Sequence, residues 1–390
     1  MTTAAPEKTQ DKAFASATIP AASAAQLGAA PRTITSKTKL ILAGFDLGTN
    51  KSCVLAGAPA STDLAVSKIV PSVVGYVKEG IVNGIISGNA PIVYGEEALR
   101  CALHVDLVPP LAEGVIARPE AARDFLKHIR EVVDPSGQAE IRAVVGIPAN
   151  AGEAARDDIR RCAQGVFDRI LLIPEPFLAA LGYRDDSRVR QPGYVDPVTN
   201  SLFIDIGGGT SDLCLVQGYF PTPDDQISVP FAGDGIDRLL HESLDRTYPQ
   251  NGFSRQTVRE IKEANAYVGP SRKPLDVKVV IGGKGRTIEL GDMIANACNT
   301  LIDRIYQPLI TLIERASSDS VVALLQNIIV TGGGSQIRGI DLVLQKRLAD
   351  DGYESPKVRL AGQDFKRYVA LGALKAARAA RENQWQVLLG

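Results

Sequence analysis

Two aspartates stand at the ends of similar apolar segments, and each is followed by small residues that suit a phosphate-binding turn. Asp46 lies in FDLGTNKSCVLAG (45–57), and Asp205 lies in IDIGGGTSDLCLVQG (204–218), about one domain length further along the chain. Each segment predicts a hairpin, because an apolar strand, a Gly/Thr/Ser turn and a second apolar strand follow one another. Such a turn exposes N–H groups that can bind phosphate, although a single copy is most often only a hairpin. The repetition favours two similar domains that face each other.

A third glycine-rich turn, TGGGSQIRG (331–339), follows the apolar segment QNIIV and leads into a predicted helix. Its N–H groups and the positive end of that helix could meet a phosphate or the plane of a nucleoside. The alternative is a strand-to-helix connection that needs glycine only for a positive φ. Because three such turns occur in one chain, we favour ligand binding.

Glu175 lies near the start of PEPFLAALGY (174–183), directly after the apolar segment RILLI. Pro176 suits the first position of a helix, so Glu175 is placed where a helix begins beyond the end of a strand. A carboxylate there can simply stabilise the helix N-terminus. It can also position a water molecule in front of bound phosphates.

The segment VREIKEANAYVG (258–269) predicts an amphipathic helix. The predicted apolar side consists of Val258, Ile261, Ala264 and Val268. The predicted polar side is a charged stripe of Arg259, Lys262 and Glu263. A stripe of this kind is usually solvated surface, so by itself it indicates no ligand.

The rest of the chain alternates predicted strands with predicted helices. Short apolar runs that end in Gly or Pro predict buried strands at 40–48, 141–148, 169–174, 201–209 and 325–334. Amphipathic stretches of helix length follow two of these strands, at 153–167 and 337–351. The alternation predicts an α/β protein with parallel or mixed sheets covered on both faces.

Composition excludes several classes of protein. Among 390 residues, 43 Lys and Arg balance 44 Asp and Glu, so no basic field would attract nucleic acid or an anionic membrane. No apolar run approaches the ~20 residues that span a bilayer. Five widely spaced cysteines indicate neither a disulfide framework nor a zinc site, which is typical of a reducing cytosol. Residues 1–38, rich in Ala, Thr, Ser and Pro, predict a disordered tail.

Together with LGALKAA (371–377), these segments resemble the actin and heat-shock-protein-70 ATPase superfamily. They follow that superfamily's order of phosphate 1, connect 1, phosphate 2, adenosine helix, adenosine loop and connect 2, from residue 39 to about 380. Within the superfamily the chain is most similar to bacterial actins, first those associated with magnetosomes and next those that determine rod shape. The long tail and the polar insertion at 184–200 depart from that pattern.

The resemblance implies an α/β actin-like ATPase fold, in which two similar RNase H-like domains, each with a smaller subdomain, surround a nucleotide cleft. The implied boundaries are 39–182 for domain I, with subdomain IB at about 71–115, and 183–370 for domain II, with subdomain IIB at about 234–300. Residues 371–390 would form a C-terminal helix that returns to domain I.

The resemblance also implies the site residues and the cofactors ATP and Mg²⁺. The β-phosphate would be bound by Gly48, Thr49 and Asn50, and the β/γ side by Gly207, Gly208, Gly209 and Thr210. Mg²⁺ would be held through water by Asp46 and Asp205. The ribose and adenine would meet Arg259, Lys262 and Glu263, and the nucleoside would be covered by Gly332, Gly333, Gly334, Ser335 and Gln336. The catalytic residues would be Glu175, Asp205 and Thr210, with Glu175 orienting the attacking water.

The implied function is an ATP-dependent cytoplasmic filament that hydrolyses ATP to turn over and that positions magnetosomes or another organelle. Its implied partners are further copies of the chain and magnetosome-associated adaptor proteins, with neither nucleic acid binding nor membrane insertion. The alternatives are a cell-shape or plasmid-segregating actin and a small-molecule kinase of the same superfamily, which would need a second substrate pocket with a base. A chaperone ATPase is disfavoured because the sequence stops about a dozen residues after LGALKAARAA.

Overall fold

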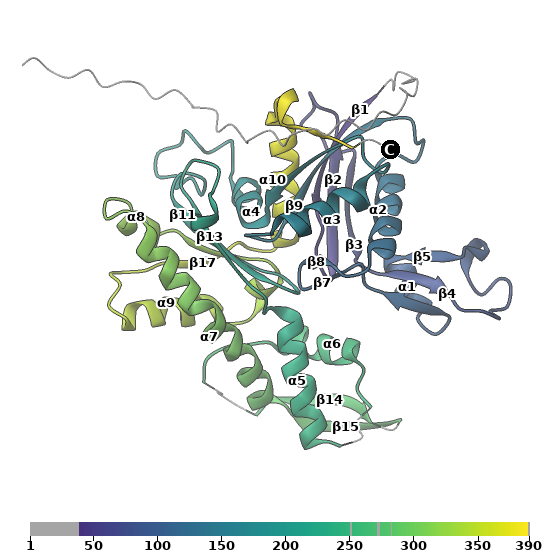
Figure 1. Cartoon of the computed structure of the whole chain (residues 1–390). Coiled ribbons are helices and arrows are strands. Elements are labelled where there is room, and N and C mark those ends of the chain that lie inside the picture. Colours follow the sequence, from purple (N-terminus) through teal and green to yellow (C-terminus); the bar gives the residue numbers. More distant parts are fainter. Residues whose placement is uncertain (1–38, 250–251, 271–273, 282, 389–390) are drawn as a thin grey trace, which may run out of the picture. The chain divides into compact units, whose positions relative to one another are not determined.

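Two sheets form the framework of the molecule (Figure 1). The computed structural model describes residues 39–249, 252–270, 274–281 and 283–388. The tail predicted at 1–38 lies outside the described residues. All the described residues belong to a single compact unit, Lys37–Gly390.

The first sheet has six strands in the order β18-β10-β9-β1-β2-β3. Its strands are β1 (Leu40–Asp46), β2 (Lys51–Gly57), β3 (Val66–Pro71), β9 (Glu140–Ile147), β10 (Arg169–Pro174) and β18 (Gln386–Val387). β1 and β2 form the antiparallel hairpin predicted around Asp46, and β9 pairs in parallel with both β1 and β10. Asp46 is therefore the last residue of a central strand, at the edge of the sheet where the hairpin turns.

The second sheet has five strands in the order β13-β12-β11-β16-β17. Its strands are β11 (Ser201–Ile206), β12 (Ser211–Val216), β13 (Gln226–Val229), β16 (Ile328–Thr331) and β17 (Val358–Leu360). As in the first sheet, three antiparallel strands are followed by two parallel ones. The repeat around Asp46 and Asp205 is thus a repeat of a whole sheet, as expected for two similar domains.

Helices cover both faces of each sheet. Two of them, α4 (Glu175–Tyr183) and α10 (Phe365–Ala379), share one apolar core with residues of both sheets, including Leu42 and Phe203. A second core joins the opposite face of the first sheet to α2 (Pro119–Val133) and α3 (Glu153–Ala163). A third joins the opposite face of the second sheet to α5 (Gly233–Thr247), α7 (Gly291–Arg315) and α9 (Ile340–Asp350). The alternation of strands and helices in the sequence predicted this layering.

α4 and α10 cross so closely that their backbones touch. A Cβ atom added to Gly372 of α10 would overlap the carbonyl oxygen of Leu178, and one added to Gly182 of α4 would overlap that of Tyr368. On its other side, α10 lies against β1, where a Cβ on Gly44 would overlap the carbonyl oxygen of Ala370. These glycines are therefore required by the close approach of the elements that join the two sheets.

Smaller elements fill the segments predicted to be subdomains. The first group is β4 (Val74–Val77), β5 (Ile92–Tyr94), α1 (Gly95–Arg100), β6 (Val105–Val108), β7 (Leu111–Ala112) and β8 (Val115–Ile116). The second group is α6 (Arg255–Asn265), β14 (Asp276–Ile281) and β15 (Lys284–Glu289), and α8 (Val321–Leu325) follows α7. Among the described helices, none combines the length and apolar content needed to cross a bilayer. The domain boundaries given above stay predictions.

The end of the chain differs from the helix predicted over 371–390. α10 begins earlier, at Phe365, and ends at Ala379, and it is followed by a short 3-10 helix (Glu382–Gln384) and by β18. β18 pairs antiparallel with the start of β10, and Trp385, 7% exposed, packs into the core between the sheets. A strand of two residues has no periodicity, so the sequence pattern could not reveal it.

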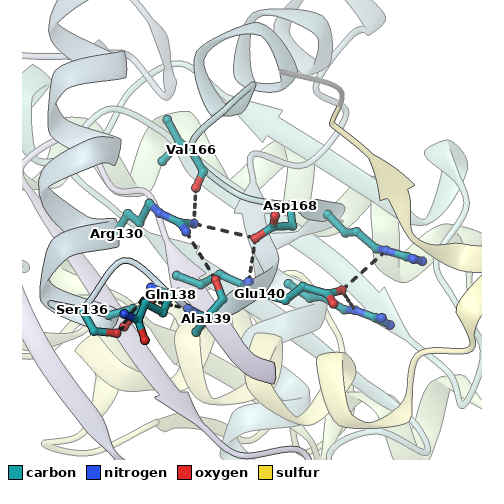
Figure 2. A network of polar contacts seen from close by, with 11 residues as sticks. Arg130, Ser136, Gln138, Ala139, Glu140, Val166 and Asp168 are labelled. Atoms are coloured by element: carbon teal, nitrogen blue, oxygen red, sulfur yellow. Dashed lines mark hydrogen bonds and ion pairs between the residues drawn. The ribbon is translucent and has the colours of Figure 1, made fainter. Parts of the chain in front are cut away.

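A polar network surrounds the start of β9 and β10, beside this last strand (Figure 2). Arg130 of α2 lies 3.8 Å from Asp168, measured from Nη1 to Oδ2. Glu382, which follows α10, forms ion pairs with Arg142 (2.6 Å) and Arg169, one from each strand. The last described residues are thus held to the first sheet by charge as well as by strand pairing.

Candidate functional site

The turns of the two repeated hairpins meet each other. Asn50 of the first turn donates a hydrogen bond from Nδ2 to Oδ1 of Asp234 in α5 (2.9 Å). A Cβ atom added to Gly208 of the second turn would overlap the same Asn50 amide nitrogen. The start of α5 is also tied to the second turn, because the amides of Gly233 and Asp234 donate to the carbonyls of Gly207 (3.2 Å) and Gly208 (2.8 Å). The structure therefore brings the two predicted phosphate turns together.

The β7–β8 hairpin closes over both turns. The amide of Gly114, a residue with φ +76°, donates to Oγ1 of Thr49 (3.3 Å). A Cβ atom on Gly209 would lie 2.6 Å from Cα of Glu113, so the second turn also packs against this hairpin. This contact was not predictable from the sequence, because residues 113–114 carry no motif.

Four carboxylates gather beside the turns. Asp46 ends β1, Glu175 begins α4, Asp205 lies in β11, and Asp212 lies opposite Asp205 in the register of β12. Asp205 and Asp212 are buried, with 8% and 1% of their surface exposed, whereas Asp46 and Glu175 are partly exposed. Sequence reasoning singled out the first three and missed Asp212. A lone aspartate in the otherwise apolar run SDLCLV was the signal that could have revealed it.

The crowding of these groups changes their protonation. Desolvation raises the pKa of Asp46 to about 7 and the pKa of Asp212 to about 6. It also raises the pKa of Glu175 well above its ordinary value, and the negative charge of Asp46, Asp212 and Asp205 adds to that rise. The pKa of Asp205 is raised well above its ordinary value by desolvation and by Asp46 and Asp212. Each carboxylate thus favours a proton, or another positive charge, beside it.

The donor set fits a hydrated magnesium ion that is shared with phosphates. Within the described ranges, no three His, Cys, Asp or Glu side chains converge closely enough to hold a metal directly. Mg²⁺ usually keeps several waters and takes only one or two carboxylates together with substrate phosphates. Asp46 and Asp205, at the ends of equivalent strands beside glycine turns, suit that mode. Their role as magnesium ligands stays a prediction.

The desolvation of Asp46 predicts a stability effect in the nucleotide-free protein. The folded state binds the proton of Asp46 more tightly than the unfolded chain does, so this stabilisation is present below the ordinary aspartate pKa and is lost as the pH rises through about 7. We expect Asp46→Asn to raise the melting temperature, by about 1–2 °C for each kcal/mol of relieved desolvation cost, more at pH 8 than at pH 5. Differential scanning fluorimetry at both pH values measures this. Asp319→Asn is the control for removing one exposed carboxylate, and an equal gain for Asp46→Asn at both pH values would contradict the prediction.

The charged stripe on α6 is only partly solvated surface, because one of its three residues, Lys262, is buried. The helix begins at Arg255, where Ser254 caps it by accepting a hydrogen bond from the Thr257 amide, and it ends at Asn265. Lys262 is buried, with 8% exposed, and it pairs with Asp237 of α5 (2.8 Å). The end of the helix also corrects the predicted apolar side: Ala264 is exposed, and Val268 is buried but lies beyond the helix.

Arg259 and Lys262 are oriented by α5 toward the turns. Arg259 forms ion pairs with Asp234 and Asp237 (3.2 Å each), and Lys262 donates to the Gly233 carbonyl (3.0 Å). Asp234 and Gly233 are also the residues that form hydrogen bonds with the two turns. Arg259 and Lys262 are therefore connected to the turns through one intervening residue of α5. Glu263 is exposed. The ribose and adenine contacts assigned to all three residues stay predictions.

The third glycine-rich turn lies directly against Asp205. Thr331, the last residue of β16, is the partner of Asp205 in the parallel register, and Gly332 follows with φ +74°. A Cβ atom on Gly332 would overlap Oδ1 of Asp205, so this position needs glycine both for its backbone angle and for the close approach. Beyond it, Gly333 has no atom within 4 Å of an added Cβ, which leaves open space on that side.

Gly334, Ser335 and Gln336 follow Gly333 in this turn. A Cβ on Gly334 would overlap the side chain of Ile206, so this glycine serves packing. Ser335 is buried and its hydroxyl donates to the Gly332 carbonyl (2.7 Å), while Gln336 is exposed. The positive φ expected of a plain strand-to-helix connection is thus present at Gly332, and nucleoside binding by the turn stays a prediction.

The fold and the arrangement of the turns define the class as an actin-like protein. The chain belongs to the MreB/Mbl protein family, whose model matches residues 42–382. It is 30% identical over 317 residues to the actin-like protein MamK of Magnetospirillum gryphiswaldense, covering 80% of this chain and 82% of the relative. It is 29% identical over 317 residues to MamK of Paramagnetospirillum magneticum, covering 80% and 85%. The sequence-based resemblance to bacterial actins is therefore confirmed.

Solved structures confirm the fold. The MamK double helical filament has a TM-score of 0.77 and 28% identity, covering 88% of this chain and 100% of that chain. A non-polymerising MamK mutant bound to AMPPNP has a TM-score of 0.61 and 28% identity, covering 87% and 99%. MreB5 of Spiroplasma citri bound to ADP, at 22% identity and a TM-score of 0.68, shows the fold alone. The predicted actin-like α/β fold is thus correct.

Proposed function

We propose that this protein is a filament-forming bacterial actin that binds and hydrolyses ATP. The observation that carries the proposal is the meeting of two repeated hairpin turns, at Asn50 and Gly208, beside the carboxylates Asp46, Asp205 and Glu175. Phosphoryl transfer asks mainly for positioning and charge neutralisation, which such an arrangement can supply. The similarity to MamK proteins that form a double helical filament or bind AMPPNP supports nucleotide-dependent assembly.

In this proposal each group of residues has one task. The two turns, Gly48 to Asn50 and Gly207 to Thr210, bind the phosphates, and the Gly207 amide shapes its turn by donating to the Thr210 carbonyl (2.9 Å). Asp46 and Asp205 hold the waters of a magnesium ion, which would neutralise phosphate charge when bound. Glu175 orients the attacking water. The nucleoside lies between α6, with Arg259, Lys262 and Glu263, and the turn of Gly332 to Gln336.

We propose further that the filament is cytoplasmic, that copies of this chain are its main partner, and that it positions an organelle, magnetosomes in particular, through adaptor proteins. The identity to MamK proteins supports this assignment. A cell-shape role is the second candidate, favoured by the MreB/Mbl match and by 26% identity to MreB of Escherichia coli. Colocalisation of the labelled protein with magnetosomes or with sites of wall growth separates the two candidates.

We expect the purified protein to sediment as filaments with ATP and Mg²⁺ and to stay in the supernatant without nucleotide. ATP can favour an assembly-competent conformation only by binding that conformation more tightly, and a site built from both sheets permits this. Sedimentation and electron microscopy measure assembly. Monomers at all protein, salt and ATP concentrations would overturn the filament proposal and leave a small-molecule kinase as the leading alternative.

A further inference from the structure

The loop after β9 reaches from the first sheet to the second hairpin. The amide of Ala149 donates to Oδ1 of Asp212 (2.9 Å), and Asn150, with φ +59°, donates from Nδ2 to the Gln226 carbonyl (2.6 Å). Asp212 lies in β12 and Gln226 in β13, so both bonds join the two repeated sheets. Asp212 is thus the point where the first sheet holds the hairpin that carries Thr210.

The second oxygen of Asp212 binds the hydroxyl of Thr210. Thr210 Oγ1 donates to Asp212 Oδ2 (2.7 Å), and both residues are buried, with 9% and 1% exposed. Above its pKa of about 6 the Asp212 carboxylate is ionised and can only accept hydrogen bonds, so at pH 7.5 or higher the hydrogen of the threonine hydroxyl points at Asp212. Because a hydroxyl has one hydrogen, Thr210 can then only accept a hydrogen bond on its other side.

We propose that Asp212 is a positioning residue that fixes Thr210 as a hydrogen-bond acceptor toward the attacking water. The proposal rests on the ATP hydrolysis proposed above. In this arrangement Thr210 cannot donate to a phosphate oxygen, whereas its lone pairs can accept a hydrogen from the water that Glu175 orients. The hydrogen bond from Ala149 holds Asp212 in place, and Asp212 in turn sets the direction of the Thr210 hydroxyl. The direction of this hydroxyl therefore depends on the contact between the two sheets.

The test is Asp212→Asn, which reverses one bond and keeps the shape. The Ala149 amide needs an acceptor, so the amide oxygen of the new residue faces Ala149 and its NH₂ group faces Thr210. That NH₂ donates to Thr210 and turns the threonine hydrogen away. We expect kcat for ATP hydrolysis to fall by about 10- to 100-fold, the value of one hydrogen bond to a charged or reacting group, while the Kd for a non-hydrolysable ATP analogue stays within about 3-fold.

Partner variants separate positioning from simple stability. Thr210→Val should lower kcat as much as Asp212→Asn, the double variant should show no further loss, and Thr210→Ser should restore activity. Ser228→Ala, which removes another hydrogen bond to Asp212 but leaves Thr210 in place, is the matched control and should stay within about 3-fold of wild type.

Four outcomes decide the matter. An Asp212→Asn protein with wild-type kcat, or one whose kcat and nucleotide affinity fall together, overturns the proposal. If that variant does not fold, wild-type kcat in Thr210→Val overturns it instead. A wild-type protein that hydrolyses no ATP would refute the ATPase itself, which is a different result from an active wild type with an unaffected variant.

Discussion

Glu175→Gln is expected to slow ATP hydrolysis by about 10²–10⁴-fold and to leave filament assembly intact. Glu175 is the first residue of α4, and desolvation together with three neighbouring carboxylates raises its pKa, so it is a group that readily takes a proton. Glutamine keeps the size of the side chain but cannot accept that proton. The filaments of this variant should therefore persist, because the hydrolysis that leads to turnover is lost.

Phosphate release, measured beside fluorescence recovery of labelled filaments, tests this expectation. Asp205→Ala is the matched comparison, because loss of a proposed magnesium carboxylate should weaken binding of Mg²⁺–ATP itself rather than only its hydrolysis. If Glu175→Gln hydrolysed ATP at the wild-type rate, Glu175 would keep only the role of a charge at a helix N-terminus.

The second large effect is expected at the crossing of α4 and α10. Alanine is normally more stable than glycine inside a helix, by about 1 kcal/mol. At Gly372 we expect the opposite, a loss of stability on replacement by alanine, because the added methyl group meets the carbonyl oxygen of Leu178, a backbone atom that cannot rotate away. We expect Gly372→Ala to lower the free energy of unfolding by about 3 kcal/mol or more, the upper end of the usual cost of overpacking.

Urea denaturation of the nucleotide-free protein measures this change. Gly285→Ala in β15 is the control, because its Cβ would meet no atom within 4 Å and its backbone angle is one that alanine accepts. A Gly372→Ala protein as stable as wild type would mean that the two helices separate at little cost.

The sequence predicted the parts of the site that local chemistry determines. The strand ends at Asp46 and Asp205 were predictable because an apolar run followed by Gly, Thr or Ser has few alternatives to a hairpin. The start of α4 at Glu175 was predictable from the adjacent proline. Each of these signals lies within a dozen residues.

The missed parts depend on contacts between distant segments. Lys262 was expected on a solvated face, but α5 supplies Asp237 from 25 residues earlier in the chain and buries the lysine. The Asp212 carboxylate looked like an ordinary strand residue until the loop of Ala149 came from the other sheet to bind it. The sequence pattern within either segment does not indicate which distant residue it will contact, so these contacts are seen only in the three-dimensional structure.

The short strand β18 affects how specifically copies of the protein can associate. An unpaired outer edge of β10 would offer free backbone groups to any extended chain, which is the usual start of disordered aggregation. β18 pairs with Arg169 and Ile170 at that edge, while Trp385 and Glu382 hold the segment in place. For a protein that is to join copies of itself in one fixed arrangement, covering the first two residues of this edge leaves less of it open to unspecific association. The C-terminal residues thereby favour order among subunits without needing to touch a neighbouring subunit.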